Sequence, residues 1–539
     1  MPAQHPDKTP QNVFDIVIIG AGFAGLYMLH KARKLGLHAR VFEVGEGVGG
    51  TWHWNRYPGA RCDVESMQYS YQFDEDLQQE WEWSERYSGQ PEILRYANHV
   101  ADRFNLRDDI QFETRVESAC FDEAEETWTI STDRHETVSA QFVVMATGCL
   151  SSTNAPVFPG QDEFEGDIHH TGRWPREGVD FSGKRVAVIG TGSSGIQAIP
   201  IIAEQADHLT VFQRTAQYAI PAHNRPLKAE EQATVKARYS EFRQENSLYP
   251  NGFSLRMPLN EMPALEASED ERATEYEARW AEGGFTFSWS FADLGTNLEA
   301  NATAASFVRN KIHEIVEDPE TAKKLSPDSV IGCKRLCLDT GYFKTFNRPD
   351  VDLVDISQQG IDRITPTGIQ CGSEQHEVDI LVLATGFDAM TGTLLAMDIR
   401  GRNGLSLTKQ WEAGPRTYLG LGIPAFPNLF TISGPGSPSV LTNMIVSIEQ
   451  HVNWISDCLE AMRAAGHQTI EASEEAADAW VAHVNEVADQ TVYPSCNSWY
   501  LGANVPGKPR VFMPLLGFPP YVEKCDEVAA SNYEGFVLG

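Results

Sequence analysis

The sequence has little basic charge. Lys and Arg number 43 against 75 Asp and Glu, which gives a formal net charge of -32 at pH 7. Nucleic acids are bound by basic surface that releases counterions from phosphates. Anionic membranes attract the same kind of surface. The deficit argues against both partners, and we expect a monomer whose partners are small molecules.

Cysteine is sparse and scattered. The 539 residues contain 9 cysteines, with no CxxC pair and no Cys/His cluster. A zinc site or a disulfide framework has characteristic spacings, so we expect no disulfide framework and no metal. Scattered thiols fit a reducing cytosol. The polar start of the chain, residues 1–13, lacks the apolar core of a signal peptide and reads as a loose tail. We expect a cytoplasmic protein.

Long apolar runs are also missing. Residues 16–29 are uncharged, but a membrane span needs roughly 20 apolar residues. Residues 418–448 are uncharged over a longer stretch that Gly and Pro interrupt repeatedly. We therefore expect no membrane span, and we expect the second stretch to line a buried site. A chain of 539 residues, 42% of them hydrophobic, is too long for one core.

A dinucleotide-binding motif opens the chain. Residues 15–19 are rich in β-branched side chains, which predicts a buried parallel strand. The following GAGFAG supplies a tight turn, close approach to a pyrophosphate and close helix–strand packing, at Gly20, Gly22 and Gly25. The predicted helix 23–35 presents its N-terminal amides to phosphate. The next strand, 39–43, ends in Glu43, which we expect to accept hydrogen bonds from the adenosine ribose.

A second motif follows the strand predicted at 185–190. It reads GTGSSG, and its candidate residues are Gly190, Gly192, Ser193, Ser194 and Gly195. The helix after it runs to Ala203, and the next strand, 209–212, leads into Arg214 and Thr215. A site specific for NAD would place an acid here, whereas an Arg can pair with a 2′-phosphate. The sequence therefore predicts NADPH, with Arg214 and Thr215 holding the phosphate.

The stretch between the two motifs carries the pattern F-x-G-x-x-x-H-x-x-x-W-P. Its residues are Phe164, Gly166, His170, Trp174 and Pro175. Alone, this pattern is compatible with a hinge that packs in the ordinary way. Between two dinucleotide motifs it resembles the fingerprint of type I Baeyer–Villiger monooxygenases, the class B flavoprotein monooxygenases. Further segments resemble the same family in the same order, and the chain most resembles the phenylacetone and steroid monooxygenase branch. These segments are 49–59, 59–66, 333–348, 411–421 and 498–510.

The resemblance implies a set of cofactor-binding residues. FAD would occupy the first site, with Gly50, Thr51 and Trp52 in the loop next to the flavin. NADP would occupy the second site, and its further contacts would be Ser194, Gln197, Lys334 and, in a loop that closes over it, Trp499. His170 and Trp174 would order the linker and the closure of the domains rather than act on substrate.

The resemblance also implies the chemistry. A ketone, aryl, cyclic or bulky, would be converted with O2 to an ester or lactone through a C4a-peroxyflavin. Arg335 would stabilise the negative charge on the peroxide and on the developing oxyanion, because Arg keeps its proton at working pH. Asp63, near the flavin ring, would hold Arg335 in place. The physiological ketone is left open.

Other flavoprotein activities fit the residues less well. A flavin N- or S-monooxygenase shares both dinucleotide motifs, but its linker fingerprint ends without HxxxWP. A disulfide reductase needs a cysteine pair after the first motif, where only Cys62 stands. A flavin-binding sensor without catalytic activity would need none of Asp63, Arg214 and Arg335.

The expected fold is α/β, with two dinucleotide-binding domains of the two-domain flavoprotein type and an inserted helical subdomain. An Ala-Thr-Gly sequence marks each crossing between the domains, at 146–148 and at 384–386. We expect a helix to begin at Ser437-Pro438 and to direct its dipole at the flavin. One departure from the family stands at Leu516–Pro520, where relatives carry a Gly-Gly pair. The expected boundaries are 1–149 and 386–539 for the FAD domain, 150–220 and 333–385 for the NADP domain, and 221–332 for the helical insertion.

Overall fold

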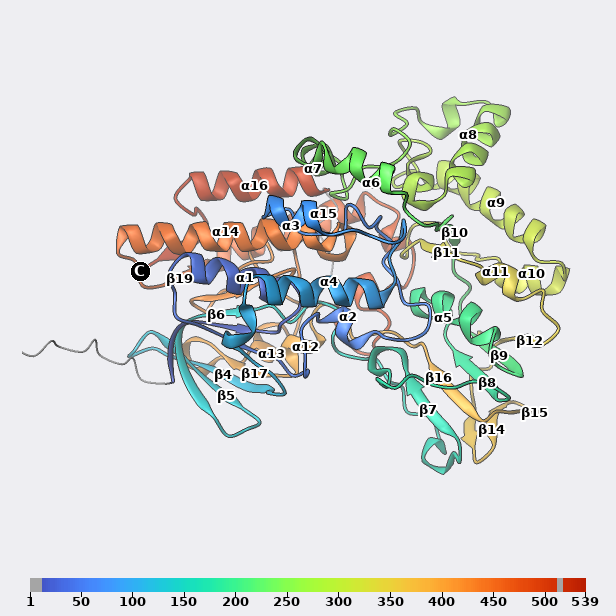
Figure 1. Ribbon diagram of the computed structural model, residues 1–539, viewed down its shortest axis with the longest axis horizontal. Coiled ribbons are helices and arrows are strands. Elements are labelled where there is room, and N and C mark those ends of the chain that lie inside the picture. The colour runs from blue at the N-terminus through green and yellow to red at the C-terminus, as the bar shows by residue number, and fades with distance from the viewer. Residues whose placement is uncertain (1–11, 511–516) are drawn as a thin grey trace, which may run out of the picture.

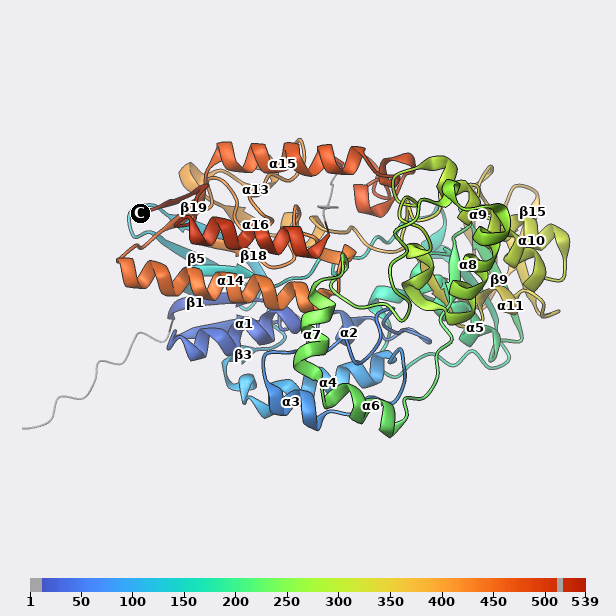
Figure 2. The same cartoon turned by 90° about the horizontal axis from the view of Figure 1, so that it is seen from above.

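Two sheets dominate the computed structural model, which describes residues 12–510 and 517–539. They lie towards opposite ends of the long axis of the molecule (Figures 1 and 2). The expectation of a loose N-terminal tail, and the part of the C-terminal departure at Leu516, lie outside the described residues. Gly517, at the described end of that departure, has φ +86° and precedes a helix.

The first sheet is eight-stranded, in the order β17-β4-β5-β6-β1-β2-β3, with β18 paired to β6. Strand β1 lies between β2 and β6 and is parallel to both. Its residues Ile16, Val17 and Ile18 are fully buried, which explains the unbroken apolar run, since a central parallel strand is covered on both faces. The strands are β1 Val13–Ile19, β2 Ala39–Phe42, β3 Ile110–Gln111, β4 Val116–Asp122, β5 Thr127–Thr132, β6 Thr137–Met145, β17 Asp398–Arg400 and β18 Leu429–Thr431.

Helices from both ends of the chain cover this sheet. Helix α1 (Phe23–Lys34), which follows the first glycine motif as predicted, packs on the long α14 (Met444–Ala465). Their apolar side chains share one core. The N- and C-terminal parts of the chain are therefore folded together. The other helices of this part are α2 Thr51–Trp54, α3 Glu75–Glu80, α4 Gln90–Arg103, α12 Gly392–Leu395, α13 Leu407–Gln410, α15 Glu474–Asp489 and α16 Phe518–Ala530.

The second sheet is five-stranded and entirely parallel, in the order β12-β9-β8-β16-β7. Helix α5 (Ser193–Ala203) follows β8 directly, as the second motif predicts. With the first sheet, this confirms the α/β fold with two dinucleotide-binding units. The strands are β7 Asp167–His170, β8 Arg185–Ile189, β9 His208–Gln213, β12 Val351–Asp355 and β16 Ile380–Leu383, and a small antiparallel sheet adds β13 Arg363–Thr365, β14 Gly368–Cys371 and β15 Glu374–Glu377.

The insertion between the two halves of the second unit is helical, as expected, but its side chains are divided between two cores. Tyr239 and Phe253 pack into the core that contains α1, whereas Tyr276 and Phe287 pack into the core of the second unit. Short parallel strands β10 (Ala219–Pro221) and β11 (Cys337–Asp339) close the insertion at its base. The insertion therefore bridges the two units. Its helices are α6 Ala229–Lys236, α7 Tyr239–Ser247, α8 Glu269–Glu282, α9 Leu298–Ile315 and α10 Pro319–Leu325, and α11 Tyr342–Thr345 follows β11.

The prediction that a helix begins at Ser437 is wrong. The Ser437 hydroxyl donates to the carbonyl of Gly434 at 2.7 Å, so it does not cap a helix. Ser439 has φ +45°, a left-handed conformation that an α-helix cannot continue through. Only a single 3-10 turn forms there, Ser439–Leu441. Helix α14 begins later, at Met444, and is capped by the Asn443 side chain.

The structure also contains one disulfide that the cysteine spacing did not indicate. Cys333 and Cys496 are paired, with their Cα atoms 6.0 Å apart and a sequence separation of 163. Spacing rules detect cysteines that are close along the chain, and this pair is made by tertiary contact. The bond joins the segment before Arg335 to the C-terminal loop. Among residues 12–510 and 517–539, no helix combines the length with the apolar composition that crossing a bilayer requires.

Candidate active site

The first glycine motif closes a tight turn beneath the N-terminus of α1. Gly20 has φ +106°, and a Cβ there would lie 2.6 Å from the carbonyl oxygen of Ala146. A Cβ on Gly25 would lie 1.8 Å from the carbonyl oxygen of Gly20. Gly22 caps the helix without a side-chain hydrogen bond. Because its first amides have no capping side chain, this end of α1 fits an anionic group such as a pyrophosphate.

Glu43 is buried behind this turn. Its Oε2 accepts a hydrogen bond from the Ala21 N–H and its Oε1 from the Gly45 N–H, both at 2.7 Å. Burial raises the pKa of the carboxyl, and the backbone hydrogen bonds oppose the shift. The side chain therefore ties the glycine turn to the loop after β2. Its expected contact with a ribose stays a prediction.

The loop expected next to the flavin forms the short helix α2. Gly50 precedes it with φ +52°, and a Cβ on Gly22 would lie 3.4 Å from the Cα of Gly50. The loop thus lies directly over the glycine turn. Trp52 is buried and donates its indole N–H to the Tyr69 hydroxyl at 3.0 Å, whereas Thr51 is exposed.

The second glycine motif repeats the construction. A Cβ on Gly190 would lie 2.5 Å from the carbonyl oxygen of Ala384, and one on Gly195 would lie 2.2 Å from that of Gly190. A Cβ on Gly192 would meet nothing within 4 Å. Ser193 is exposed in the first turn of α5, with its hydroxyl 3.3 Å from the Cys337 sulfur. There is open room here for a second phosphate group.

Two cations stand together beyond the end of β9. Arg214 and Thr215 are exposed, and Lys334 is half-buried nearby. Burial, and then repulsion from Arg214, lower the pKa of the Lys334 ammonium. Within residues 12–510 and 517–539 neither cation forms an ion pair, although the acid Asp328 opposes the lowering of the Lys334 pKa. Two neighbouring cations that form no ion pair fit a doubly charged anion such as the 2′-phosphate of NADP.

Gln197 joins the two units instead of presenting a free amide. Its Nε2 donates to the carbonyl of Arg61 at 3.1 Å, and its Oε1 accepts from the Tyr57 hydroxyl at 2.8 Å. A Cβ on Gly59 would lie 2.2 Å from the carbonyl oxygen of Gln197, so the backbones are in close contact. Burial raises the pKa of the Tyr57 phenol to about 12, and the neighbouring Ser194 opposes that shift. The expected approach of Gln197 and Ser194 to nicotinamide stays a prediction.

Arg335 lies where the first unit, the second unit and the helical insertion meet. Its Nε and Nη2 form a bidentate pair with Asp63, at 2.9 Å to Oδ2 and 2.8 Å to Oδ1. Its Nη1 donates to the carbonyl of Val440 at 2.6 Å. The guanidinium lies 5.2 Å from the centroid of the Phe285 ring. The pairing of Arg335 with Asp63, separated by 272 residues, is the geometry that the family resemblance implies.

This guanidinium stays charged although it is largely buried. Burial opposes the charge, but Asp63 and then Tyr500 hold the pKa of Arg335 above its ordinary value. Its side chain is 21% exposed and that of Asp63 is 27% exposed. A permanent cation in such a site can stabilise an oxyanion without giving up a proton.

Tyr500 is a residue that sequence reasoning missed. It is buried against Cys149, Ala389, Met390 and Val440, where the crossings between the units meet the C-terminal loop. Burial raises the pKa of its phenol, and Arg335 opposes that shift. The expected residue Trp499 lies beside it, with 4.4 Å between ring centroids. In the sequence, only its position next to Trp499 pointed to it.

The linker motif forms the edge strand β7 and its continuation. His170 Nδ1 accepts the Gly172 N–H at 3.0 Å, so the ring hydrogen is on Nε2. That nitrogen lies 3.2 Å from the Thr385 hydroxyl and 3.3 Å from the carbonyl of Asn154. Burial lowers the pKa of His170. His170 is therefore neutral, and its hydrogen bonds link the two segments that cross between the units. In the described part of the chain it forms no hydrogen bond with Arg335 or Asp63.

The other residues of the motif pack inside the second unit. A Cβ on Gly166 would lie 2.2 Å from the carbonyl oxygen of Asp379, which precedes β16. Phe164 packs on the core at that edge. Trp174, followed by Pro175, is buried, with its ring 6.2 Å from that of Phe181. The motif holds β7 against β16.

Comparisons with known proteins identify the family of the chain. A family model described as pyridine nucleotide-disulphide oxidoreductase matches residues 17–250. A Baeyer-Villiger monooxygenase of Pseudooceanicola batsensis is 46% identical, over 98% of this chain and 97% of its own length. A phenazine N-monooxygenase of Lysobacter antibioticus is 41% identical, over 99% of this chain and 98% of its own. A solved structure of oxidised steroid monooxygenase bound to NADP is 52% identical with a TM-score of 0.93, covering 98% of this chain and 99% of its own. The chain therefore belongs to the Baeyer–Villiger monooxygenase family of oxidoreductases.

Proposed function

We propose that this protein is an FAD- and NADPH-dependent Baeyer–Villiger monooxygenase that converts ketones to esters or lactones with O2. The observation that carries the proposal is the Arg335–Asp63 pair, which holds a positive charge in place in a chain with two glycine-rich nucleotide motifs. The family to which the chain belongs supports the reaction class. Aryl, cyclic and bulky ketones are the substrate classes to be tested first.

The residues present fit both cofactors. FAD would lie on the first motif, with its pyrophosphate at the end of α1 and the loop that contains Gly50 and Trp52 over it. NADP would lie on the second motif, with its 2′-phosphate at Arg214, Thr215 and Lys334. When bound, the two cofactors supply the reducing equivalents and the activated oxygen.

Arg335 would act on the charge that develops on oxygen as the ketone is attacked. An oxyanion in a site from which water is excluded is stabilised by a cation that is already in position. Asp63 fixes the orientation of the guanidinium through both carboxylate oxygens, and Phe285 supports its face. Because the pKa of Arg335 is raised, the residue holds its proton throughout and acts electrostatically.

A panel of ketones tests the proposal. The purified protein is incubated with NADPH and O2, with and without each ketone, and products are identified by gas chromatography and mass spectrometry. We expect NADPH oxidation to rise with at least one ketone and the product to be an ester with one added oxygen atom. NADPH oxidation that no ketone changes, with hydrogen peroxide as the sole product, would contradict the proposal.

Oxygenation at nitrogen is the second candidate. It is favoured by the similarity to a phenazine N-monooxygenase, although the HxxxWP ending of the linker favours the ketone reaction. Heteroaromatic amines belong in the same panel. An N-oxide adds the same mass as an ester but survives alkaline hydrolysis, so hydrolysis separates the two outcomes.

We further propose that the enzyme is a cytoplasmic monomer. The net charge of -32 supports a monomer, because copies repel one another. Seven unpaired cysteines support a reducing compartment, whereas the Cys333–Cys496 pair is unusual there. Light scattering during size-exclusion chromatography tests the first part, since a mass near 59.9 kDa is that of one chain.

A further inference from the structure

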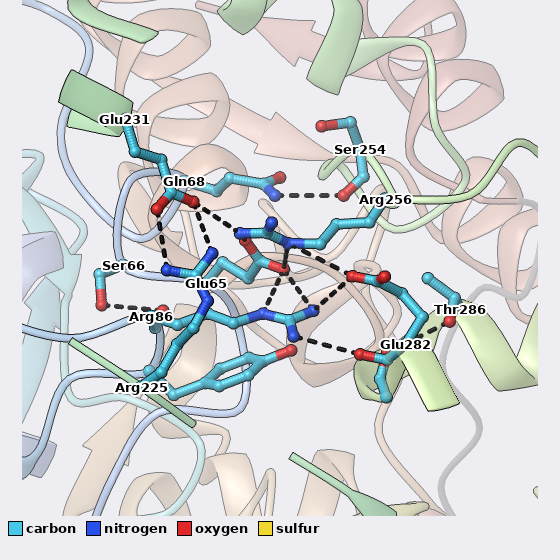
Figure 3. Close-up of polar contacts among 12 residues, drawn as sticks. Glu65, Ser66, Gln68, Arg86, Arg225, Glu231, Ser254, Arg256, Glu282 and Thr286 are labelled. Carbon is cyan, nitrogen blue, oxygen red and sulfur yellow. Dashed lines mark hydrogen bonds and ion pairs between the residues drawn. The ribbon is translucent and has the colours of Figure 1, made fainter. Parts of the chain in front are cut away.

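Six charged side chains form one ionic cluster between the first unit and the helical insertion (Figure 3). Arg256 lies at its centre and donates to Glu65 Oε1 at 2.7 Å and to Glu231 Oε1 at 3.4 Å. Arg86 binds the same Glu65 at 2.9 Å and lies 3.6 Å from the Glu282 carboxylate. The ionic cluster comprises Glu65, Arg86, Arg225, Glu231, Arg256 and Glu282.

Arg86 is the most enclosed member. Its side chain is 4% exposed, against 31% for Arg256 and 41% for Arg225. Besides its two carboxylate partners it donates from Nη1 to the backbone carbonyl of Glu282 at 3.2 Å. Its guanidinium also lies 5.1 Å from the centroid of the Tyr87 ring. A buried cation with several fixed partners sets the positions of those partners, because leaving any of them unpaired is costly.

The two acids that Arg86 binds are close in sequence to the two residues that contact Arg335. Glu65 lies two residues after Asp63, which pairs with Arg335. Glu282 is followed by Gly283 and Gly284 and then by Phe285, which packs under the Arg335 guanidinium. A single side chain thus connects both supports of the active-site cation, one from the first unit and one from the insertion.

The connecting segments leave little room for independent movement. A Cβ on Gly284 would lie 2.4 Å from the Tyr87 hydroxyl oxygen, so this backbone rests on the residue after Arg86. A cavity of about 20 Å³ between the segments is lined by Asp63, Arg86, Arg256 and Phe285, among others. That volume holds about one water molecule. We therefore expect a displacement of Glu65 or Glu282 to shift Asp63 and Phe285 as well.

We propose that Arg86 is a positioning residue for the oxygenation step, acting through Glu65 and Glu282 to hold Asp63 and Phe285 on Arg335. The inference rests on the proposed function of Arg335. It assigns a task in the reaction to a charged side chain that does not itself contact Arg335. A displacement on the order of 1 Å in a catalytic group costs up to about a hundredfold in rate.

The test compares Arg86→Met with a matched control. Met keeps most of the length of the side chain and removes the charge and the fork. Arg402→Met is the control, because Arg402 also pairs with a glutamate, Glu471 at 2.6 Å, and also lies over an aromatic ring, Phe121 at 5.6 Å. It stands in the turn after β17, the end strand of the first sheet. We measure FAD content, KM for NADPH, ester formed per NADPH oxidised and hydrogen peroxide released.

We expect Arg86→Met to keep FAD and a KM for NADPH within about threefold of wild type. Ester per NADPH should fall about tenfold or more, with hydrogen peroxide accounting for the difference, and Arg402→Met should resemble wild type. Hydrogen–deuterium exchange gives a second readout that does not depend on turnover. Peptides covering 60–66 and 282–290 should exchange faster in Arg86→Met and unchanged in Arg402→Met.

Glu282→Gln keeps the test decisive if Arg86→Met does not fold. Glu282 is 36% exposed and its backbone contact with Arg86 survives the change, so we expect the same shift from ester to peroxide in smaller degree. Unchanged ester per NADPH in the variant that folds would overturn the positioning role. A wild-type enzyme that makes no ester from any ketone would instead overturn the proposed function, so the two failures are distinct.

Discussion

The orientation of the Arg335 guanidinium depends on residues that are remote in sequence. Asp63 and Val440 engage all three guanidinium nitrogens, which fixes the plane of the group. The family resemblance pointed to the pairing of Asp63 with Arg335. It did not point to Tyr500 or Phe285, because the tertiary packing that places these two residues near Arg335 leaves no pattern in the sequence.

Removal of the Arg335 charge should separate reduction from oxygenation. In Arg335→Ala we expect NADPH to bleach the flavin anaerobically at nearly the wild-type rate, while ester formation falls at least about a hundredfold, the usual scale for one preorganised electrostatic donor. Arg335→Lys should rescue poorly, since an ammonium cannot form the bidentate contact with Asp63. Stopped-flow absorbance and product analysis give the two rates. A variant that cannot be reduced would place Arg335 in nicotinamide positioning instead.

Arg214 should determine the choice between the two nicotinamide cofactors. Loss of a charge-assisted contact to phosphate costs about 1.5–3 kcal/mol, or roughly tenfold to a hundredfold. In Arg214→Ala we expect kcat/KM for NADPH to fall by that factor and kcat/KM for NADH to change little. Lys334→Ala should act in the same direction, because Arg214 lies close enough to Lys334 to lower the pKa of its ammonium. An unchanged ratio in both variants would rule out this site for the 2′-phosphate.

At the scale of elements, strands and helices next to the glycine motifs were predictable. The apolar runs before Gly20 and Gly190 became β1 and β8, and α1 and α5 follow them. The linker motif did not read as a strand, because Asp167–His170 has no apolar alternation and forms β7 only by pairing with β16. The helix start at Ser437 failed for a related reason. A Ser-Pro signal is local, and the hydroxyl found a partner outside a helix.

The disulfide should stabilise the C-terminal loop against the arginine segment. It closes a loop of 163 residues, for which the chain-entropy model gives about 5 kcal/mol at most. We expect Cys496→Ser to lower both the melting temperature and the amount of ester formed per NADPH oxidised. Cys120→Ser, at an unpaired and partly exposed cysteine, should change neither. Alkylation of the denatured wild type should label seven cysteines before reduction and nine after it. Nine labels before reduction would show that the bond does not form.

At the scale of the whole molecule, the two dinucleotide units were predictable and the way they are joined was not. Each unit follows from a strand, a glycine turn and a helix that are consecutive in the chain. The helical insertion contributes to both cores, and the ionic cluster ties it to the first unit. Such contacts depend on which surfaces meet after folding. The expected domain boundaries stay a prediction.

Buried histidines should make the molecule acid-sensitive. His451 is fully buried, accepts the Ser433 N–H at Nδ1 and lies 2.9 Å from the Tyr521 hydroxyl through Nε2. Burial lowers its pKa to about 3, and burial lowers the pKa values of His30 and His53 to about 4. The neutral rings therefore stabilise the fold above the ordinary histidine pKa of about 6.5, and this contribution is lost as the pH falls from there towards 3–4.

Acids whose pKa burial raises oppose this trend. Burial raises the pKa of Glu449 to about 7, so its stabilising contribution is greatest at low pH and is lost as the pH rises from about 4.5 to 7. Burial also raises the pKa values of Glu43, Asp339 and Asp457 and lowers those of His169 and His170. Because five histidines oppose four carboxyls, and the ordinary histidine pKa of about 6.5 lies between the two pH values, we expect the free energy of unfolding to be smaller at pH 5 than at pH 7.5. His451→Gln should be less stable at pH 7.5 but should lose less on acidification, while His483→Gln, at an exposed histidine on α15, should follow wild type. Urea unfolding at the two pH values measures both differences. Equal losses in His451→Gln and wild type would show that His451 takes up its proton without unfolding.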